Sequence, residues 1–426
     1  MNLFASKILV FISFISMTCF LNAQDRSKFF GYDKANKKHN QELPLDTNTN
    51  KIIKIDLSKI NNQNKINNQN KLNIFQEDVR NHFERKTSGN QKRVAILLPF
   101  CTENYTLNDM SPFGVSVTSL KLLEGVLLAV DSFRSLGVDI QVDVFDTQKD
   151  KDVVKNLISN NGLSSYHIIF GPLYSSNFRL VSDYYRQDRS KILINPLSDQ
   201  IDLVTKNQNV YSLTPDRDVL IDSLVFFFKD KIKNADNIIL LGLKKESDKL
   251  NNIKSYLALD SIDCNIKLLD YKSFNLSSIK HLFESGMNVV VVPSKDESFV
   301  GKIIPYLGIL DHDIVLLGMK SWSNIDQLDI GTLMKLNTHV ADYSFWNTNV
   351  SRNKNLSLSF EKKFNHSLDK YSLLSFQSLM HFCMSRDTYS SLPSHFKFYK
   401  LPGSGGYLNI NIKILKYSDY LLSPVD

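Results

Sequence analysis

Short apolar runs recur along the chain from Arg93 onward, and stretches with helical spacing separate them. Several of the runs are continuously apolar, which is typical of strands in a parallel sheet whose two faces are both covered. The predicted strands are residues 94–98, 140–145, 168–170, 192–194, 210–213, 238–241, 266–269, 289–292, 314–317 and 340–343.

The stretches between these runs carry apolar residues at the spacing of an α-helix. In one of them Leu120, Leu123, Leu127 and Val130 fall on one helical face. Strands that alternate with helices indicate β-α-β units with right-handed crossovers. A chain of 426 residues is also longer than one core usually holds. We therefore predict an α/β fold with two Rossmann-like lobes, each built on a parallel sheet.

The last part of the chain has a different pattern. Residues 402–406 form a Gly-rich turn, and residues 407–417 then alternate Leu408, Ile410, Ile412 and Ile414 with polar residues. Alternation of this kind predicts a half-exposed antiparallel strand in a C-terminal edge hairpin.

The N-terminal part lacks the alternation of strands and helices. Lys7 precedes an apolar stretch, and Ala23 offers a cleavage site, so residues 1–23 are predicted to be a signal peptide. Cys19 leaves lipoprotein anchoring as the alternative. Within residues 24–92, Lys-Ile-Asn-Asn-Gln-Asn occurs twice, at 59–64 and 65–70, and the segment holds too little apolar surface to offset the entropy of ordering. We predict a disordered Asn/Lys-rich tether there, and contact with anionic envelope polymer is its functional alternative.

The formal net charge of +7 arises outside the predicted lobes. Residues 93–426 contain 36 Lys and Arg against 36 Asp and Glu. This balance gives no support for a nucleic-acid-binding surface. After the N-terminal segment, no stretch approaches the ~20 apolar residues of a membrane span, so an integral membrane protein is not expected.

The residues that usually carry catalysis or bind metals are scattered. Removal of the signal peptide leaves Cys101, Cys264 and Cys383, and this odd number at wide spacing predicts buried free thiols. His312 is interpreted as part of a solvated turn. Gly318-Met319-Lys320-Ser321 ends like a phosphate-binding loop but lacks its first glycine. The sequence therefore predicts a non-enzymatic protein with no cofactor and no metal.

Polar residues follow two predicted strands directly. The strand at 168–170 stops at Gly171-Pro172 and passes to Tyr174-Ser175-Ser176-Asn177, and the strand at 192–194 passes to Asn195-Pro196-Leu197-Ser198-Asp199. In open α/β sheets, ligands bind beyond the carboxyl ends of the strands, where helix N-termini favour anionic and carbonyl groups. The alternative is that Ser175, Ser176 and Asn177 only cap the following helix.

A series of ordered motifs resembles a known family. The motifs are ValAlaIleLeuLeuProPhe (94–100), LeuGluGlyValLeuLeuAlaValAsp (123–131), PheAspThrGlnLysAsp (145–150), IlePheGlyProLeuTyrSerSerAsn (169–177), AsnProLeuSer (195–198) and TyrSerLeuThrProAsp (211–216). From about residue 93 to the end, the chain resembles the type I periplasmic binding proteins, to which the branched-chain amino-acid-binding proteins belong. It is most similar to an envelope subgroup often joined to LysM peptidoglycan-binding modules, although no LysM module is visible.

The resemblance implies two lobes that close like a hinge on a small ligand. It places the first lobe at about 93–215 and 317–395, and the second at about 216–316 and 396–426. It implies ligand contacts from two loops of the first lobe and one of the second, with residues 243–245 as a weaker candidate. The implied ligand-binding residues are Tyr174, Ser175, Ser176, Asn177, Ser198, Asp199, Ser294 and Lys295.

One position departs from the pattern of the amino-acid binders. Asp199 stands where they usually have Thr, and its carboxylate would repel the carboxylate of an amino acid. Trp322 and Trp346 follow late strands, and either stacking on a ligand or packing in a core fits them. Asp296 and Glu297 are interpreted as an exposed helix start.

These features predict an exported binding protein of the periplasm or cell envelope. Its expected partner is a small polar solute, amino-acid-like or other, and an ABC permease would follow if the protein serves transport. The alternative is an envelope scaffold or regulator that binds peptidoglycan or a cell-wall synthesis protein, with the tether giving reach.

Overall fold

The computed structural model describes residues 92–102, 114–215, 217–270, 274–347, 350–384 and 396–425. The predicted signal peptide, Cys19 and the predicted tether up to Gln91 lie outside the described residues, as does Asp216.

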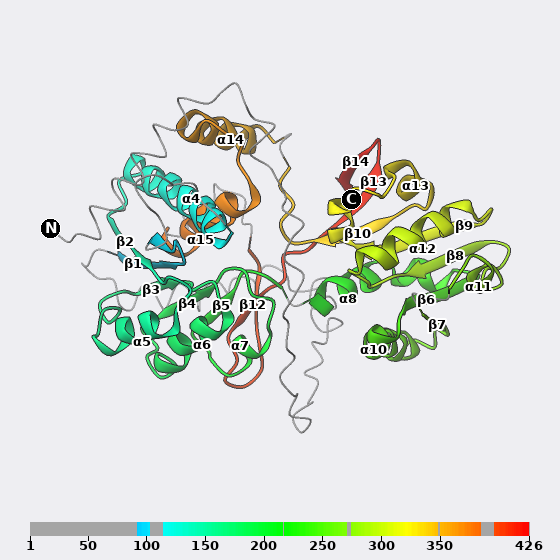
Figure 1. Cartoon of the computed structure of the whole chain (residues 1–426), viewed down its shortest axis with the longest axis horizontal. Helices are drawn as coiled ribbons and strands as arrows, with labels where there is room; N and C mark the ends of the chain where they lie inside the picture. Colours follow the sequence, from blue (N-terminus) through cyan, green and yellow to red (C-terminus); the bar gives the residue numbers. More distant parts are fainter. Residues whose placement is uncertain are drawn as a thin grey trace, which may run out of the picture.

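Two seven-stranded sheets form the centres of two lobes (Figure 1). The first sheet contains, in spatial order, β11 (Phe398–Lys400), β12 (Tyr407–Asn409), β5 (Val210–Ser212), β4 (Ile192–Asn195), β3 (Ile168–Phe170), β1 (Lys92–Leu98) and β2 (Ile140–Asp146). The second contains β14 (Leu421–Pro424), β13 (Lys413–Ser418), β10 (His339–Asp342), β9 (Asp313–Met319), β8 (Met287–Val291), β6 (Asn237–Leu243) and β7 (Asn265–Leu269).

Helices cover both sheets. The first lobe has α4 (Val115–Ser135), α5 (Lys151–Ser159), α6 (Ser175–Tyr184), α7 (Asp202–Thr205), α14 (Ser351–Phe364) and α15 (Lys370–Cys383). The second has α8 (Arg217–Phe227), α9 (Lys229–Lys233), η2 (Lys244–Glu246), α10 (Ser247–Ala258), α11 (Ser277–Lys280), α12 (Glu297–Ile309), η3 (Lys320–Asn324) and α13 (Ile330–Lys335). The predicted α/β fold with two lobes is confirmed, and all ten predicted strands are present with shifts of a few residues at their ends.

The continuous apolar runs are explained by the two faces of the first sheet. Along β1, Val94, Ile96 and Leu98 enter the core beneath α4 and α15, while Ala95 and Leu97 enter the core beneath α5, α6 and α7 (Figure 1). Full burial of an aliphatic side chain contributes roughly 1.5–3 kcal/mol. Among the described residues, each buried core stays within one lobe.

The lobe boundaries expected from the resemblance require correction. The chain passes between the lobes after β5, after β10 and after β12. Residues 317–342, expected in the first lobe, belong to the second, because β10 pairs in parallel with β9. Residues 396–409, expected in the second lobe, belong to the first, because β12 pairs with β5 and the Tyr407 and Tyr211 rings stack with centroids 4.2 Å apart.

The single strand predicted at 407–417 is divided between the lobes. Its first part is β12, and after residues 410–412 its second part, β13, pairs antiparallel with β14 in the edge hairpin. The fully buried Asn409 ends β12: its amide donates to the Leu213 carbonyl at 2.9 Å and its side-chain oxygen accepts from the Lys397 and Asn411 N–H groups. The hairpin prediction is confirmed, and the continuous strand is wrong.

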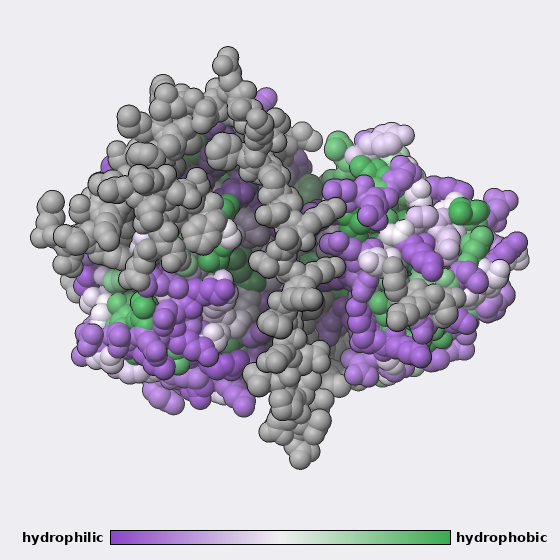
Figure 2. All heavy atoms as spheres, in the orientation of Figure 1, coloured by the Kyte–Doolittle hydropathy of each residue, from purple (hydrophilic) through white to green (hydrophobic). Residues whose placement is uncertain are grey.

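Cys101, Cys264 and Cys383 are buried free thiols, as predicted. Hydrophilic residues cover most of the described surface of both lobes in the view of Figure 2. Within the described part of the chain, no helix combines the length and apolar character needed to cross a membrane.

Candidate functional site

The loop after β3 can only be built around a glycine. Gly171 has φ +83°, and a Cβ at this position would lie 2.3 Å from the Leu97 carbonyl oxygen. Its N–H donates to the Ile194 carbonyl at 2.9 Å. The backbone of β3 therefore passes tightly between β1 and β4 at its end, and the polar residues 174–177 follow at the carboxyl edge of the sheet.

These polar residues do not cap the helix that they begin. The N-cap of α6 is Tyr174, which makes no side-chain cap bond, and Ser175 and Ser176 are the first two helical residues. The interpretation of the serines as mere caps is therefore wrong. Ser175 is half-buried and Ser176 is exposed. The first turn of α6 thus places two hydroxyl groups beside the positive end of the helix dipole.

The structure brings two of the predicted loops together. The Ser175 and Ser198 hydroxyl oxygens are 2.9 Å apart and share a hydrogen bond. Because Ser175 follows β3 and Ser198 follows β4, this contact joins the carboxyl ends of neighbouring parallel strands.

Asn195 holds the Ser198 loop in place. Its buried side chain accepts from the Ser198 N–H at 3.1 Å and donates to the Ser198 carbonyl at 2.8 Å. The same amide donates to the Ser212 hydroxyl at 3.1 Å. Asn195 therefore fixes the position of Ser198 relative to β5. The sequence analysis names Asn195 only as part of a motif and does not predict that it positions Ser198.

Asp199 lies near the point where the chain enters the first lobe for the second time. The pKa of Tyr343, directly after β10, lies above its ordinary value because the hydroxyl is buried and because Asp342 and Asp199 carry negative charge nearby. A hydrogen bond with Thr214 opposes this shift. Tyr343 thus connects the end of β10 in the second lobe to the ends of β4 and β5. The sequence pattern places Tyr343 at the end of a strand and gives no sign of this role.

Tyr174 and Asn177 have different surroundings. The Lys149 ammonium lies 5.1 Å from the centre of the half-buried Tyr174 ring. Asn177 is buried, and its amide donates to the Asp150 carbonyl at 3.3 Å. Asn177 therefore ties α6 to the start of α5.

A buried carboxylate organises the neighbouring loop. Asp146, at the end of β2, accepts hydrogen bonds from the N–H groups of Phe100, Cys101, Thr102 and Gln148 at 2.9–3.1 Å. The Thr102 hydroxyl adds a further bond at 2.8 Å. These bonds fix the segment after β1 beside the loop that contains Lys149.

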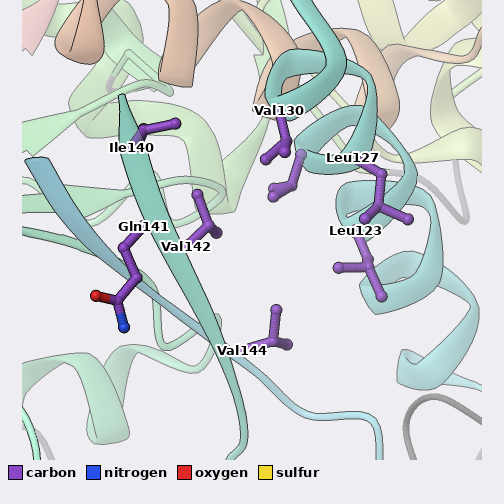
Figure 3. A pocket seen from close by; sticks show the side chains of 8 residues that line it. Leu123, Leu127, Val130, Ile140, Gln141, Val142 and Val144 are labelled. Carbon is purple, nitrogen blue, oxygen red and sulfur yellow. The ribbon is translucent and has the colours of Figure 1, made fainter. Parts of the chain in front are cut away.

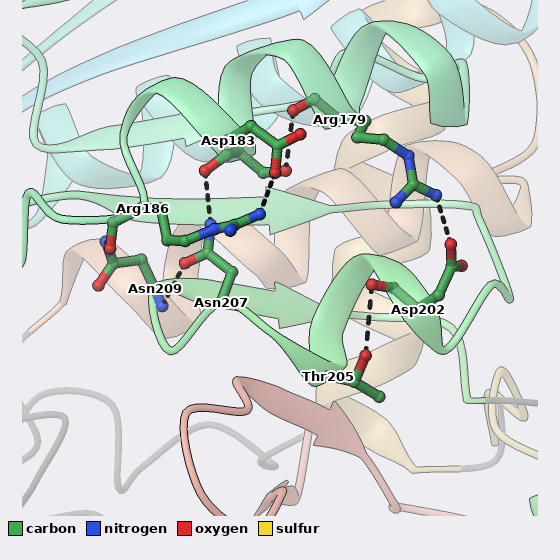
Figure 4. A network of polar contacts seen from close by, with 8 residues as sticks. Arg179, Asp183, Arg186, Asp202, Thr205, Asn207 and Asn209 are labelled. Carbon is green, nitrogen blue, oxygen red and sulfur yellow. Dashed lines mark hydrogen bonds and ion pairs between the residues drawn. The ribbon is translucent and has the colours of Figure 1, made fainter. Parts of the chain in front are cut away.

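Polar contacts along the middle and the C-terminal end of α6 join this helix to α7 and to the segment before β5 (Figure 4). Arg179 pairs with Asp202 of α7, and Arg186 pairs with Asp183. The amide of Asn207 donates to the Ser182 carbonyl at 2.6 Å, and that of Asn209 donates to the Tyr185 carbonyl at 2.9 Å. The position of Ser175 at the N-terminus of α6 therefore rests on a fixed helix.

The predicted ligand loop of the second lobe, which contains Ser294 and Lys295, forms hydrogen bonds within its own lobe. Ser294 is fully buried; its hydroxyl accepts from the Asp296 N–H at 3.2 Å and its carbonyl accepts from the Trp322 indole N–H at 2.9 Å. Trp322 is a core residue covering Gly318, so ligand stacking is wrong for Trp322 in this structure. Trp346 is half-buried in the segment after β10, and Lys295 is exposed.

The weaker candidate loop meets the same segment. The Lys245 ammonium, in η2, lies 2.7 Å from an Asp296 carboxylate oxygen. Their hydrogen bond lowers the pKa of Asp296 and raises that of Lys245. Asp296 is the N-cap of α12 and accepts from the Phe299 N–H, while Glu297 begins the helix. The interpretation of Asp296 and Glu297 as a helix start is confirmed.

The contacts of His312 are structural, and no metal-binding cluster occurs in the described part of the chain. The half-buried His312 bonds to the Glu284 carbonyl at 3.1 Å and stacks on Phe283. No group of three or more His, Cys, Asp or Glu side chains suited to a metal occurs among the residues that the structure describes.

No family model and no curated protein matches this sequence. Solved structures do match it. A putative branched-chain amino acid ABC transporter protein from Rhodospirillum rubrum has a TM-score of 0.59 at 8% identity over 79% of this chain and 100% of its own. Full-length LpoA from Haemophilus influenzae has a TM-score of 0.51 at 14% identity, over 79% of this chain and 59% of its own. The C-domain of LpoA, described as a regulator of PBP1A, has a TM-score of 0.50 at 12% identity.

Proposed function

Because the chain has the type I periplasmic-binding-protein fold, we propose that it is an exported, non-enzymatic protein that binds a small polar solute between its lobes. The hydrogen bond between Ser175 and Ser198 carries this proposal, because it unites the ends of β3 and β4 into one polar surface. The N-terminus of α6, without a side-chain cap, adds donors to the same surface.

The residues divide into those that face the solute and those that position them. We assign direct contact to Tyr174, Ser175, Ser176, Ser198 and Asp199, with Lys295 as the contribution of the second lobe. Asn177 and Ser294 are buried and bonded within their own lobes, so they support the loops.

The charge of Asp199 restricts the chemistry of the solute. A carboxylate at this place repels an anionic group and favours an ammonium group or a hydroxyl group. A solute whose hydroxyl, amide or ammonium groups meet Ser198 and Asp199 fits better than one that brings a carboxylate to them. Whether the solute then passes to an ABC permease depends on a partner outside this chain.

A thermal-shift screen tests the proposal. The protein is heated with amino acids, sugars, nucleosides and muropeptides in separate wells. A solute at about 100 times its dissociation constant adds about 2.7 kcal/mol to the free energy of unfolding, which raises Tm visibly. Such a shift supports the proposal, and no shift with any class contradicts it.

The closed loops of the second lobe favour a second function. Ser294 is buried and Lys245 is engaged by Asp296, so these two candidate groups are less available to a solute. An envelope scaffold or regulator would need no solute and would instead bind peptidoglycan or a cell-wall synthesis protein. The fold likeness to LpoA is consistent with this alternative. Pull-down from envelope extract and sedimentation with purified peptidoglycan test it directly.

A further inference from the structure

Three segments connect the two lobes. They follow β5, β10 and β12, and their described parts are residues 213–215, 343–347 and 410–412. The segments after β10 and before β13 run side by side, because Asp342 and Lys413 are partners at the end of the β10–β13 ladder (Figure 1). A residue directly beyond β10 therefore stands where the sheet of the second lobe ends, and its contacts with the first lobe depend on the relative orientation of the two lobes.

Tyr343 is this residue. Its hydroxyl shares a hydrogen bond with the side chain of Thr214, two residues after β5. The Thr214 hydroxyl in turn donates to the Pro196 carbonyl at 3.1 Å. Since a hydroxyl carries one proton, the Thr214 oxygen accepts the proton of Tyr343. A chain of hydrogen bonds therefore runs from the end of β10 to residues 196–199, the ligand loop after β4.

The other bonds at this place stay within the first lobe. The buried Asn409 donates to the Leu213 carbonyl at 2.9 Å. Asn195 bonds to Ser198 and to Ser212. These bonds persist whatever the orientation of the second lobe. The bond between Tyr343 and Thr214 is different, because Tyr343 is attached directly to a strand of the second lobe.

Burial makes this bond matter for the arrangement of the lobes. Thr214 is buried, and Tyr343 is half-buried. A buried hydroxyl that loses its partner pays a desolvation cost, so a lobe orientation that keeps Tyr343 within reach of Thr214 is favoured. The same orientation fixes the oxygen that bonds to Pro196. The position of the ligand loop and the orientation of the lobes are thereby coupled, and such coupling acts equally in both directions.

The apolar pocket of the first lobe lies outside this chain of bonds. It has a volume of about 400 Å³ between α4 and β2, with Leu123, Leu127 and Val142 among its walls (Figure 3). None of its lining residues belongs to the ligand loop or to a connecting segment. The pocket wall therefore supplies a reference position in the same lobe.

We propose that Tyr343 is a positioning residue of the candidate solute site, and that it acts through Thr214 on Pro196. Pro196 begins the ligand loop, so its position sets that of Ser198 and Asp199. The second lobe thus acts on the polar surface of the first lobe without contacting a solute through Tyr343. The inference rests on the proposed function, because only a solute site gives the position of this loop a purpose.

Cysteine labelling in the full chain tests this role without a solute. Leu197 is half-buried and packs on the core of the first lobe, so Leu197→Cys reacts with a maleimide when the ligand loop opens. The described native cysteines are buried, and peptide mapping by mass spectrometry assigns the labelled position. Tyr343→Phe in this background removes one hydroxyl and keeps the ring. Labelling should become about fivefold faster, which corresponds to the loss of a hydrogen bond of about 1 kcal/mol.

Two substitutions of Thr214 show whether Tyr343 acts through it. Thr214→Val removes the hydroxyl with little change of shape, so labelling of Leu197→Cys should be at least as fast as with Tyr343→Phe. Adding Tyr343→Phe to Thr214→Val should change the rate no further, because the two side chains act as one chain of bonds. Thr214→Ser keeps the hydroxyl and should restore the slow labelling of the parent.

Leu127→Cys in the pocket wall is the matched control. Leu127 is the same residue type, is also half-buried and packs on the same core. Its labelling rate should be equal with and without Tyr343→Phe. A parental rate at Leu197→Cys, an equal acceleration at Leu127→Cys, or a full effect of Tyr343→Phe in the Thr214→Val background would overturn the proposal. Because these rates involve no solute, they stand apart from the thermal-shift screen, and either result can fail while the other holds.

Discussion

The strand ends of the two lobes differ in the polar side chains that a ligand could reach. In the first lobe, Ser175 and Ser198 meet at 2.9 Å at the edge of the sheet, and α6 starts without a side-chain cap. In the second lobe, Ser294 is buried beneath its own loop, and Lys245 pairs with Asp296.

This difference indicates an unequal division of work between lobes of similar architecture. A buried group such as Ser294 cannot reach a ligand, whereas the half-buried Ser175 and Ser198 hydroxyls keep further hydrogen-bonding capacity after they bond to each other. We therefore expect the first lobe to carry most of the recognition and the second lobe to close over it. Four predictions test the features of the two lobes that this comparison uses, in order of decreasing effect.

The largest effect is expected from Gly171→Ala. The substitution adds a Cβ where φ is +83° and where the Leu97 carbonyl oxygen would lie at 2.3 Å. Backbone strain and the steric clash together should lower the free energy of unfolding by roughly 3 kcal/mol or more. Urea unfolding measures this loss. Gly137→Ala is the control, because φ is +68° there but no atom lies within 4 Å. A similar loss in both variants would mean that Gly171 is not tightly enclosed.

A smaller effect is expected from mild acidification of the second lobe, from pH 6.5 to 5. Burial lowers the pKa of His339 in β10 to about 4. Since the unfolded chain binds a proton near pH 6.5 and the folded chain does not, stability should fall as pH decreases from 6.5 to about 4, by about 1.4 kcal/mol per pH unit. The buried His381 of the first lobe should act in the same direction, because its pKa is also lowered to about 4.

Tryptophan fluorescence during urea unfolding, measured in a Trp346→Phe background, follows the second lobe, because the remaining tryptophan, Trp322, lies in its core. His339→Gln should flatten the pH dependence of this signal between pH 6.5 and 5, by about 2 kcal/mol. His366 provides a contrast in the first lobe: its hydrogen bond to Glu124 raises its pKa, so its stabilisation is full below pH 6.5 and is lost as pH rises through the folded pKa. An unchanged pH dependence in His339→Gln would contradict the assignment.

The next effect concerns solute affinity. Ser175→Ala combined with Ser198→Ala removes two hydroxyl groups from the proposed site, and each hydrogen bond is worth about 0.5–1.5 kcal/mol. The dissociation constant should rise about tenfold or more, as measured by calorimetric titration. Ser164→Ala, whose hydroxyl bonds locally to the Asn161 carbonyl, is the matched control and should bind as the parent does.

The smallest effect is expected from Lys245→Ala. The side chain of Lys245 is 62% exposed, so its ion pair with Asp296 is screened by water. Its loss should change the free energy of unfolding by less than about 1 kcal/mol. Lys295→Ala should weaken solute binding less than the double serine variant does. A larger loss of affinity in Lys295→Ala would reverse the proposed division between the lobes.

The sequence predicted local features better than connections between lobes. The strand at 168–170 has its predicted bounds because its apolar run ends at Gly171, and the turn at this position accepts only glycine. The division of residues 407–417 was not predictable, because its alternation of apolar residues continues through the crossing and only the bonds of buried Asn409 end the strand. The role of Tyr343 was also not predictable, because its neighbours Asp199 and Thr214 are distant in sequence.

The candidate site shows the same limit. Ser175 and Ser198 were predicted from their places after two strands, and their contact follows from the parallel order of β3 and β4. The burial of Ser294 could not be predicted from the sequence, because its contact with the Trp322 indole joins residues 28 positions apart in the chain.

Small-angle X-ray scattering with and without the solute found in the thermal-shift screen tests the central claim most directly. If the solute binds between the lobes and draws them together, the radius of gyration of the parent should fall when it is added. That of the Ser175→Ala, Ser198→Ala variant should stay at the value of the free protein at the same solute concentration. Tight binding without any decrease in the radius of gyration, or an equal decrease in the variant, would contradict a site between the lobes that is built on these two serines.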